Sequence, residues 1–301
     1  MWNLANFQNE VREQDTINSS FYTRTFQFCP SLRKTIMNEY IRQLLLMDEM
    51  REPTIRQAMK ALHLPPGSRG LDVGCGSGAL TLALVKEIGS NGHVTGLDSA
   101  ASHIAYSTER AKESSVADRV SFQEGSMYDL PFEQNSFDWA WSVDCVGYSP
   151  LEPKKALSEC QRVVKPGGIV ALLAWSSEKL LPGYPRLEGI LSSTKQGYAP
   201  FKTGMPPGEH FSRAMGWFSE LGFKDIKASA FAGSVQAPLS PKMREALIAL
   251  FDMRWNGAES ELSEKDAQEF RRLIKSDSED FILNLPDYYM FFNYSMFWGV
   301  V

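Results

Sequence analysis

The sequence is poor in cysteine, has no excess of positive charge and contains no long apolar run. Its four cysteines (Cys29, Cys75, Cys145 and Cys160) form no CxxC pair and no metal-ligand spacing. They therefore predict reduced thiols of an intracellular protein and no bound metal. The formal net charge of −5 removes the broad electrostatic reason to expect nucleic acid as a partner.

Segments that could enter or cross a membrane are missing as well. Runs such as IVALLAW are much shorter than the roughly 20 apolar residues that span a bilayer. The opening stretch MWNLANFQNEVREQ has no basic segment followed by an apolar one, which a secretory signal requires. The sequence therefore predicts a cytoplasmic protein without a membrane span.

The composition that remains is typical of a globular protein with a sizeable core. The chain has 301 residues, of which 43% are hydrophobic and 22% are charged. From Leu71 onward, short apolar runs alternate with segments of helical length. This alternation is typical of βαβ units and a parallel sheet, so we expect an α/β fold.

Residues 1–236 divide into a helical segment and a core. Residues 1–64 show apolar positions at helical spacing, and residues 65–236 carry the alternating pattern of the core. Within the core, residues 176–208 are rich in proline and glycine and are too long for an ordinary connection. We expect this insertion to be a functional loop or a lid.

Residues 237–301 predict an inserted helical pair and a final strand. Ser240-Pro241 is a start signal for one helix, and Ser263 with Asp266 resembles a capping box for another. Residues 237–286 are therefore expected to form an inserted helical cap. The aromatic and β-branched residues of 287–301 favour a final strand of the core sheet.

A glycine-rich stretch, GLDVGCGSGALTLALV at residues 70–85, lies between a predicted strand and a predicted helix. Gly74, Gly76 and Gly78 would let the backbone turn tightly and approach a ligand without interference from a Cβ atom. With Ala79, the same letters also satisfy the dinucleotide fingerprint G-x-G-x-x-G/A. The loop alone therefore leaves a nicotinamide-dependent oxidoreductase open.

Three further features favour a different cofactor. Asp72 stands two residues before the first glycine, and Asp98 ends the next predicted strand. Downstream, EGSMYDLPFEQNSFDWAWS is followed by LSECQRVVKPGGIVALLAW. In order, spacing and content, these motifs resemble those of class I S-adenosylmethionine-dependent methyltransferases. The motif sequences are most similar to those of the members that methylate quinone precursors in ubiquinone and menaquinone biosynthesis.

The resemblance implies a Rossmann-like, seven-stranded, mostly parallel sheet flanked by helices, with S-adenosylmethionine as the cofactor and S-adenosylhomocysteine as its product. It implies that Asp72 orients the loop and the methionyl ammonium group. The backbone of Gly74, Cys75 and Gly76 would line the methionyl and ribose portion. Asp98 would accept hydrogen bonds from both ribose hydroxyls.

The resemblance also assigns residues to the adenine and to the methionyl end. Ser99 and His103 would lie against the nucleoside, although His103 could equally be a surface residue of its helix. Ser126 stands where the family often has Asp, and its hydroxyl can still accept a hydrogen bond from the adenine amino group. Met127 would contact the adenine ring, and Ser142 would contact the methionyl group.

Methyl transfer from a sulfonium requires positioning of the acceptor and no protein nucleophile. If the acceptor needs a general base, Asp144 and Tyr148 are candidates because they follow the fourth predicted strand, and His210 is a third. Asp144 could instead be a cap or loop carboxylate, and His210 a surface histidine. Without an unmistakable base, a non-catalytic S-adenosylmethionine-binding protein stays open.

The N-terminal and inserted segments are expected to enclose a small-molecule acceptor over the methyl end of the cofactor. The sequence leaves open the identity of the acceptor, the atom that is methylated (O, N, C or S) and the oligomeric state.

Overall fold

The computed structural model describes residues 30–148, 152–197 and 205–301. The chain divides into two compact units, 1–43 and 44–301, which are taken separately. Helix α2 (Pro30–Ala61) crosses this boundary, and its residues 30–43 are the described part of the first unit. The helical segment predicted for 1–64 is therefore helical from Pro30, and residues 1–29 lie outside the described part.

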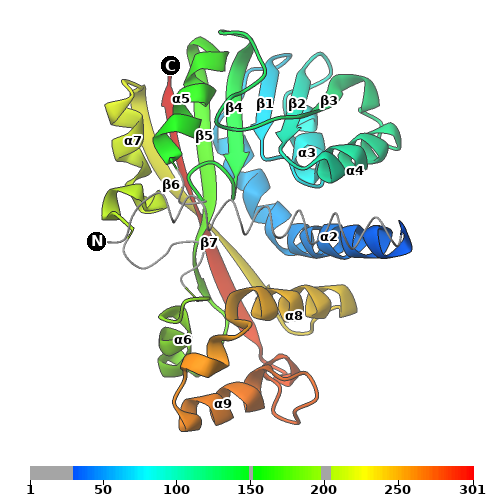
Figure 1. Cartoon of the computed structure of the whole chain (residues 1–301), viewed down its shortest axis with the longest axis vertical. Coiled ribbons are helices and arrows are strands. Elements are labelled where there is room, and N and C mark those ends of the chain that lie inside the picture. The colour runs from blue at the N-terminus through cyan, green and yellow to red at the C-terminus, as the bar shows by residue number, and fades with distance from the viewer. Residues whose placement is uncertain (1–29, 149–151, 198–204) are drawn as a thin grey trace. The chain divides into compact units, whose positions relative to one another are not determined.

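The second unit is built on one seven-stranded sheet with the order β3-β2-β1-β4-β5-β7-β6 (Figure 1). The first five strands are parallel, whereas β7 is antiparallel to both β5 and β6. The predicted Rossmann-like sheet is confirmed. The strands are β1 (Arg69–Val73), β2 (His93–Asp98), β3 (Val120–Glu124), β4 (Phe137–Val143), β5 (Val164–Lys179), β6 (Lys224–Gln236) and β7 (Tyr289–Val300).

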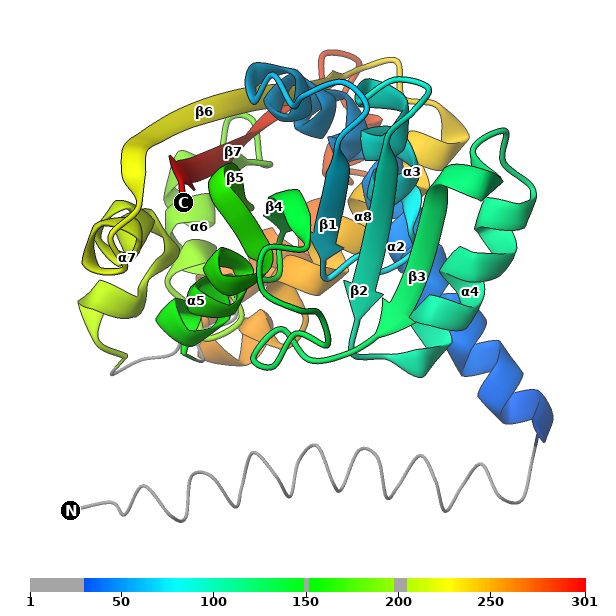
Figure 2. The same ribbon diagram turned by 90° about the horizontal axis from the view of Figure 1, so that it is seen from above.

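Helices cover both faces of the sheet (Figure 2). Apolar residues of α3 and α4 share one core with Trp139 and Trp141, and those of α5 and α7 share another with Ala140. The helices are α3 (Ala79–Glu87), α4 (Ala101–Lys112), α5 (Pro153–Val163), α6 (Pro185–Ser192), α7 (Ala214–Glu220), α8 (Pro241–Trp255) and α9 (Glu264–Ile274). None of the described helices is long and apolar enough to cross a membrane.

Close packing between β1 and β4 depends on one glycine. A Cβ atom at Gly70 would lie 2.0 Å from the ring of Trp139, which therefore needs glycine at this position. The indole Nε1 of Trp139 donates a hydrogen bond of 2.8 Å to Ser68 Oγ, so the buried ring keeps its polar atom satisfied. This contact fixes the strand that leads into the glycine-rich loop.

The two helices between β6 and β7 begin where their sequence signals indicate. Ser240 Oγ accepts a hydrogen bond from Met243 N at the start of α8, and Ser263 Oγ accepts one from Asp266 N at the start of α9. Such caps satisfy backbone N–H groups that have no partner within the helix. Helices α8 and α9 lie within residues 237–286, and β7 covers Tyr289–Val300.

The segment 176–208 is more regular than its proline and glycine content indicates. Strand β5 continues to Lys179, because residues 177–179 pair with residues 291–293 of β7. Pro185 then occupies the first turn of α6, where a missing N–H costs nothing. The described part of this segment therefore contains the end of β5 and helix α6, and residues 198–204 lie outside the described residues. Figure 1 shows α6, α8 and α9 gathered at the far end of the long strands β5, β6 and β7.

Candidate cofactor and acceptor site

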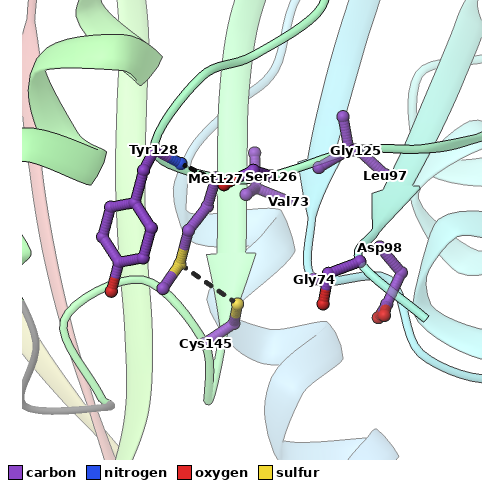
Figure 3. Close-up of a pocket in the computed structure, with 10 residues that line it drawn as sticks. Val73, Gly74, Leu97, Asp98, Gly125, Ser126, Met127, Tyr128 and Cys145 are labelled. Atoms are coloured by element: carbon purple, nitrogen blue, oxygen red, sulfur yellow. Dashed lines mark hydrogen bonds between the residues drawn. The ribbon is translucent and has the colours of Figure 1, made fainter. Parts of the chain in front are cut away.

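A pocket of about 150 Å³ lies at the carboxyl ends of β1, β2 and β4 (Figure 3). In open α/β sheets, ligands bind at this edge of the strands. Five of the predicted cofactor residues line it: Gly74, Asp98, Ser99, Ser126 and Met127. Sequence reasoning did not select the other lining residues, which are Val73, Leu97, Gly125, Tyr128 and Cys145.

The glycine-rich loop turns immediately after β1 and is held by β2. The backbone N–H groups of Gly74 and Cys75 both donate to Leu97 O, at 2.7 and 3.0 Å. Gly74 has a φ of +82°, and a Cβ atom there would lie 2.5 Å from Cys145 Sγ. Only glycine fits this position. Since the N–H of Cys75 is engaged with Leu97, its predicted role toward the cofactor stays a prediction.

Asp98 is the best-anchored polar group of the pocket. Its Oδ2 accepts a hydrogen bond from Gly76 N at 2.9 Å, and its Oδ1 accepts from Ala100 N at 3.0 Å and lies 3.1 Å from His103 Nδ1. Burial alone would raise the pKa of Asp98, but the hydrogen bonds from His103 and Ala100 outweigh it and lower the pKa. The structure thus brings His103 against a charged carboxylate at the pocket wall.

Asp72 and Ser142 lie beneath the loop and not in the pocket lining. Asp72 is 2% exposed and accepts a hydrogen bond of 2.6 Å from Thr81 Oγ1, which ties β1 to α3. Burial raises the pKa of Asp72 to about 7, although the Thr81 hydrogen bond opposes this. Ser142 Oγ donates to Val73 O at 2.8 Å and accepts from Val146 N at 3.0 Å. Their predicted contacts with the methionyl group stay predictions.

Ser126 and Met127 form the wall opposite the glycine loop. Ser126 is exposed, and its Oγ accepts a hydrogen bond of 3.2 Å from Tyr128 N. Met127 Sδ lies 3.8 Å from Cys145 Sγ, so the soft sulfur atoms of both residues meet at the end of β4. Cys145 is the residue that joins this pocket to Asp144.

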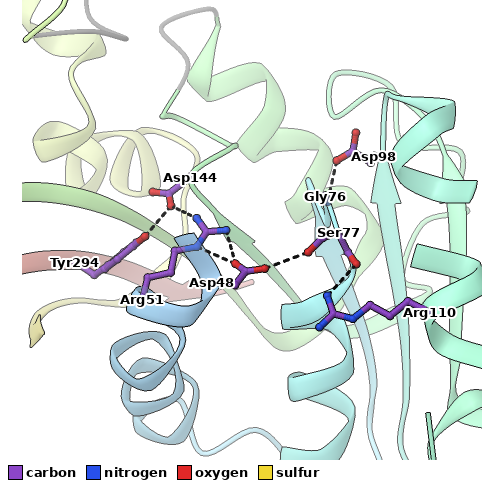
Figure 4. A network of polar contacts seen from close by, with 8 residues as sticks. All are labelled: Asp48, Arg51, Gly76, Ser77, Asp98, Arg110, Asp144 and Tyr294. Atoms are coloured by element: carbon purple, nitrogen blue, oxygen red, sulfur yellow. Dashed lines mark hydrogen bonds and ion pairs between the residues drawn. The ribbon is translucent and has the colours of Figure 1, made fainter. Parts of the chain in front are cut away.

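Asp144 follows β4 directly and accepts three hydrogen bonds, of which Figure 4 shows those from Arg51 and Tyr294. Its Oδ2 accepts from Arg51 Nη1 and from Tyr294 Oη, both at 2.8 Å, and its Oδ1 accepts from Trp175 N at 2.8 Å. The donors belong to α2, β7 and β5. Sequence reasoning missed Arg51 and Tyr294 because they lie 93 and 150 positions from Asp144 along the chain.

Next to Asp144, aromatic rings gather around a second ion pair. The ring of Trp175 stacks on Phe292 with a centroid distance of 4.4 Å and meets Tyr294 edge-on at 5.6 Å. The guanidinium of Arg254 lies 5.2 Å from the Trp175 ring, and its Nε donates to both carboxylate oxygens of Glu178, at 2.8 and 3.0 Å. Arg254, from α8, thereby connects the inserted helices to β5.

The two other predicted catalytic residues have different surroundings. Burial raises the pKa of the Tyr148 phenol, against the opposing effect of Arg254, to which it is hydrogen-bonded. Tyr148 therefore belongs to the same polar cluster as Glu178. His210 is exposed, and its Nδ1 accepts a hydrogen bond of 3.2 Å from Ser212 N at the start of a 3₁₀ turn. Within the described residues, no group of His, Cys, Asp and Glu could hold a metal ion.

Comparisons with known proteins agree with this geometry. A family model described as a methyltransferase domain matches residues 71–168. The chain is 29% identical over 197 residues to a demethylmenaquinone methyltransferase of Staphylococcus haemolyticus, covering 60% of this chain and 79% of the relative. With the enzyme of the same name from Staphylococcus aureus (strain JH9) it shares 30% identity over 199 residues, covering 60% and 78%.

A solved structure resembles a larger share of this chain in its fold than the sequence relatives do in sequence. The YcgJ protein from Bacillus subtilis superimposes with a TM-score of 0.51 at 17% identity, covering 83% of this chain and 98% of that chain. The sheet order, the pocket at its carboxyl edge and these matches lead to one conclusion. The chain belongs to the class I S-adenosylmethionine-dependent methyltransferases.

Proposed function

We propose that this methyltransferase acts on a small aromatic molecule that binds beside Asp144, Trp175 and Tyr294. One observation carries the proposal: Trp175 is only partly buried, stacks on Phe292 and donates its backbone N–H to Asp144. Asp144 is adjacent in the chain to Cys145, which lines the cofactor pocket. An aromatic acceptor at Trp175 would therefore lie next to the end of the pocket from which the methyl group must come.

The residues of the pocket fit the methyl donor. Asp98 offers a charged carboxylate for the ribose hydroxyls, and Gly74, which has no Cβ atom, lets the loop pack against Cys145 at the pocket wall. Ser99, Ser126 and Met127 would hold the adenine. The volume of about 150 Å³ is below the 300 Å³ at which pockets for drug-sized ligands begin, so we assign it to the nucleoside portion.

The residues of this chain position the acceptor and exclude water. S-adenosylmethionine supplies the methyl group on a sulfonium sulfur, and the acceptor atom must be held at about 3 to 3.5 Å from the methyl carbon. Three hydrogen bonds fix the orientation of the Asp144 carboxylate beside the end of β4. We therefore propose that Asp144 orients the acceptor. Burial raises the pKa of the Tyr148 phenol, so Tyr148 keeps its proton, and we propose that it also positions the acceptor.

The names of the curated relatives favour a quinol-like acceptor among the aromatic compounds. Those proteins are demethylmenaquinone methyltransferases, and the matched family model ends at residue 168. Trp175, Arg254 and Tyr294 follow that residue, so they can set a different specificity on the same cofactor site. The oxidoreductase alternative loses its support, because the glycine-rich loop that suggested it belongs to a methyltransferase.

A panel of acceptors tests the proposal. The protein is incubated with S-adenosylmethionine and naphthoquinols, catechols, simple phenols, aliphatic amines or a sterol, and release of S-adenosylhomocysteine is measured. We expect release with one or more of the aromatic compounds, and a lower turnover in Trp175→Ala and Tyr294→Phe. Tyr289→Phe is the matched control, because Tyr289 lies on the same strand and is 49% exposed.

Two outcomes would contradict this function. Turnover of amines or the sterol alone would show that the acceptor is not aromatic. Tight binding of S-adenosylhomocysteine with no release from any acceptor would favour the non-catalytic alternative.

We further propose that α8, α9 and the described residues of the segment 176–208, which are 176–197 and 205–208, act as a cap over the acceptor. The contact of Arg254 in α8 with Glu178 and Trp175 in β5 supports this assignment. Backbone hydrogen exchange around Trp255 and in 176–197 should slow when S-adenosylhomocysteine and an acceptor analogue are both present, and change less with S-adenosylhomocysteine alone. Exchange that ignored both ligands would contradict the cap.

A further inference from the structure

We propose that Arg51 is a positioning residue that connects the glycine-rich loop to Asp144, so that the cofactor side and the acceptor side of the site are aligned together. The name acceptor side rests on the proposed function. The contacts themselves do not depend on it.

A continuous line of side-chain contacts runs between the two sides (Figure 4). Ser77 Oγ, in the glycine-rich loop, donates to Asp48 Oδ2 at 3.1 Å. Asp48 Oδ1 accepts from Arg51 Nε at 3.0 Å and from Nη2 at 2.8 Å. Arg51 Nη1 donates to Asp144 Oδ2 at 2.8 Å. Helix α2 thus places one cation between two carboxylates that belong to different parts of the site.

Burial makes this cation difficult to replace. Asp48 is 6% exposed, and the side chain of Arg51 is 17% exposed. Burial alone would lower the pKa of Arg51, but Tyr294, Asp48 and Asp144 outweigh it and raise the pKa. The planar guanidinium reaches both carboxylates with different nitrogen atoms, whereas an ammonium group offers a single point charge. A lysine at this position could hold one carboxylate well and not both.

At the loop end, the line reaches the residue assigned to the ribose. Ser77 follows Gly76, whose N–H donates to Asp98 Oδ2 at 2.9 Å. Arg110 Nη1 lies 3.5 Å from Ser77 O and supports the same turn. A shift of Ser77 would therefore move the N–H that holds Asp98. Asp48 and Arg51 both precede residues 71–168, which match the family model. The residues that position the loop therefore lie outside the matched domain.

A double-mutant cycle on ligand affinity tests the connection. Ser77→Ala, Arg51→Lys and the double variant are compared with the wild type for S-adenosylhomocysteine binding by calorimetry. We expect each single change to weaken binding about fivefold, and the double change to weaken it by little more than about fivefold, because both act through Asp48. Arg56→Lys is the control, because Arg56 lies on the same helix and also forms an ion pair, with Glu52. The side chains of Arg56 and Glu52 are 38% and 36% exposed.

Additive effects, which would give a loss of about 25-fold in the double variant, would overturn the proposal, as would unchanged affinity in Arg51→Lys. If thermal unfolding shows that Arg51→Lys is not folded, Asp48→Asn replaces it in the cycle, and the expected result is the same. Because the readout is S-adenosylhomocysteine affinity, a non-additive cycle supports the connection even if no aromatic acceptor is methylated. That second result would count against the proposed function alone.

Discussion

The two sides of the site are assembled in different ways. The cofactor side is built from residues 72–103 and 125–127, which lie on adjacent strands and use backbone N–H groups as donors. The acceptor side draws Arg51, Asp144, Trp175, Arg254 and Tyr294 from five separate elements and uses ion pairs and rings. Local motifs therefore specify the first side, whereas long-range packing specifies the second.

The sides also treat buried carboxyl groups differently. On the acceptor side, the partly buried Asp144 is paired with the cation Arg51. On the cofactor side, Asp72 is buried against the hydroxyl of Thr81. The charge on Asp72 is thus uncompensated by an ion pair, and this contrast gives the first prediction.

The largest expected effect is a fall in stability with rising pH that originates at Asp72. Its pKa is about 7 in the folded chain against an ordinary 3.8, so the folded state holds a proton that the unfolded state releases between these values. The free energy of unfolding should therefore fall as the pH rises through that window, by at most about 4 kcal/mol. Urea unfolding at pH 5 and pH 8 measures this difference. In Asp72→Asn, the fall in the free energy of unfolding between the two pH values should be smaller, because asparagine does not titrate.

Asp118→Asn, at an exposed position before β3, is the matched control and should keep the wild-type dependence. If Asp72→Asn showed the same fall as the wild type, Asp72 would be ionised in the folded chain.

A second prediction separates the backbone requirement of the loop from its contact with Cys145. Gly74 and Gly89 both have positive φ, but a Cβ atom at Gly89 would meet nothing within 4 Å. Gly89→Ala should cost about 1 kcal/mol of unfolding free energy, and Gly74→Ala about 3 kcal/mol because the clash with Cys145 adds to it. Chemical unfolding compares them, and calorimetry should show loss of S-adenosylhomocysteine binding in Gly74→Ala only. Equal losses of stability would mean that Cys145 moves aside freely.

A third prediction sets one carboxylate of each side against the other. Asp98→Ala should weaken S-adenosylhomocysteine binding by about 2 kcal/mol, because the ribose hydroxyls and Gly76 N lose a charged acceptor. Asp144→Asn should change the same affinity by less than about 0.5 kcal/mol while lowering methyl transfer. Calorimetry on both variants is the measurement. Similar losses of affinity in both would erase the distinction between the sides.

The smallest expected effect concerns the ion pair of the acceptor side. The side chains of Arg254 and Glu178 are 13% and 19% exposed, so Glu178→Gln should lower the free energy of unfolding by about 1 kcal/mol. The double change with Arg254→Met should cost less than the sum of the single changes. Urea unfolding tests this, and S-adenosylhomocysteine affinity serves as the internal control. Strict additivity would show that the two residues do not act as a pair.

The sequence could predict the cofactor side because its information is local. Gly74, Asp98 and Ser126 stand at the ends of successive parallel strands, and parallel strands bring those ends to one edge. Even there, the partners of Asp72 and Ser142 were not foreseen, because hydrogen bonds to Thr81 and Val73 leave no pattern in the sequence.

The acceptor side could not be predicted because its partners are set by strand register. Trp175 lies opposite Tyr294 in the pairing of β5 with β7, and the described residues between them include α6, α7, α8 and α9. The proline and glycine content of residues 176–208 predicted a functional loop or a lid, and it did not reveal that pairing with β7 extends β5 to Lys179. Backbone pairing thus overrode local composition, as it does when a neighbouring strand offers a full set of hydrogen bonds.

The long pairing of β7 with β5 and β6 has a practical consequence for engineering this chain. Successive side chains of a strand alternate between faces, so inserting or deleting one residue within β7 would turn Tyr294 away from Asp144 and bring Asn293 or Ser295 to its place. Grafts that aim to change the acceptor should therefore replace the stretch between Gln236 and Tyr289 as a whole. Junctions at those two strand ends would exchange α8 and α9, including Arg254, and leave the hydrogen bond between Tyr294 and Asp144 in register.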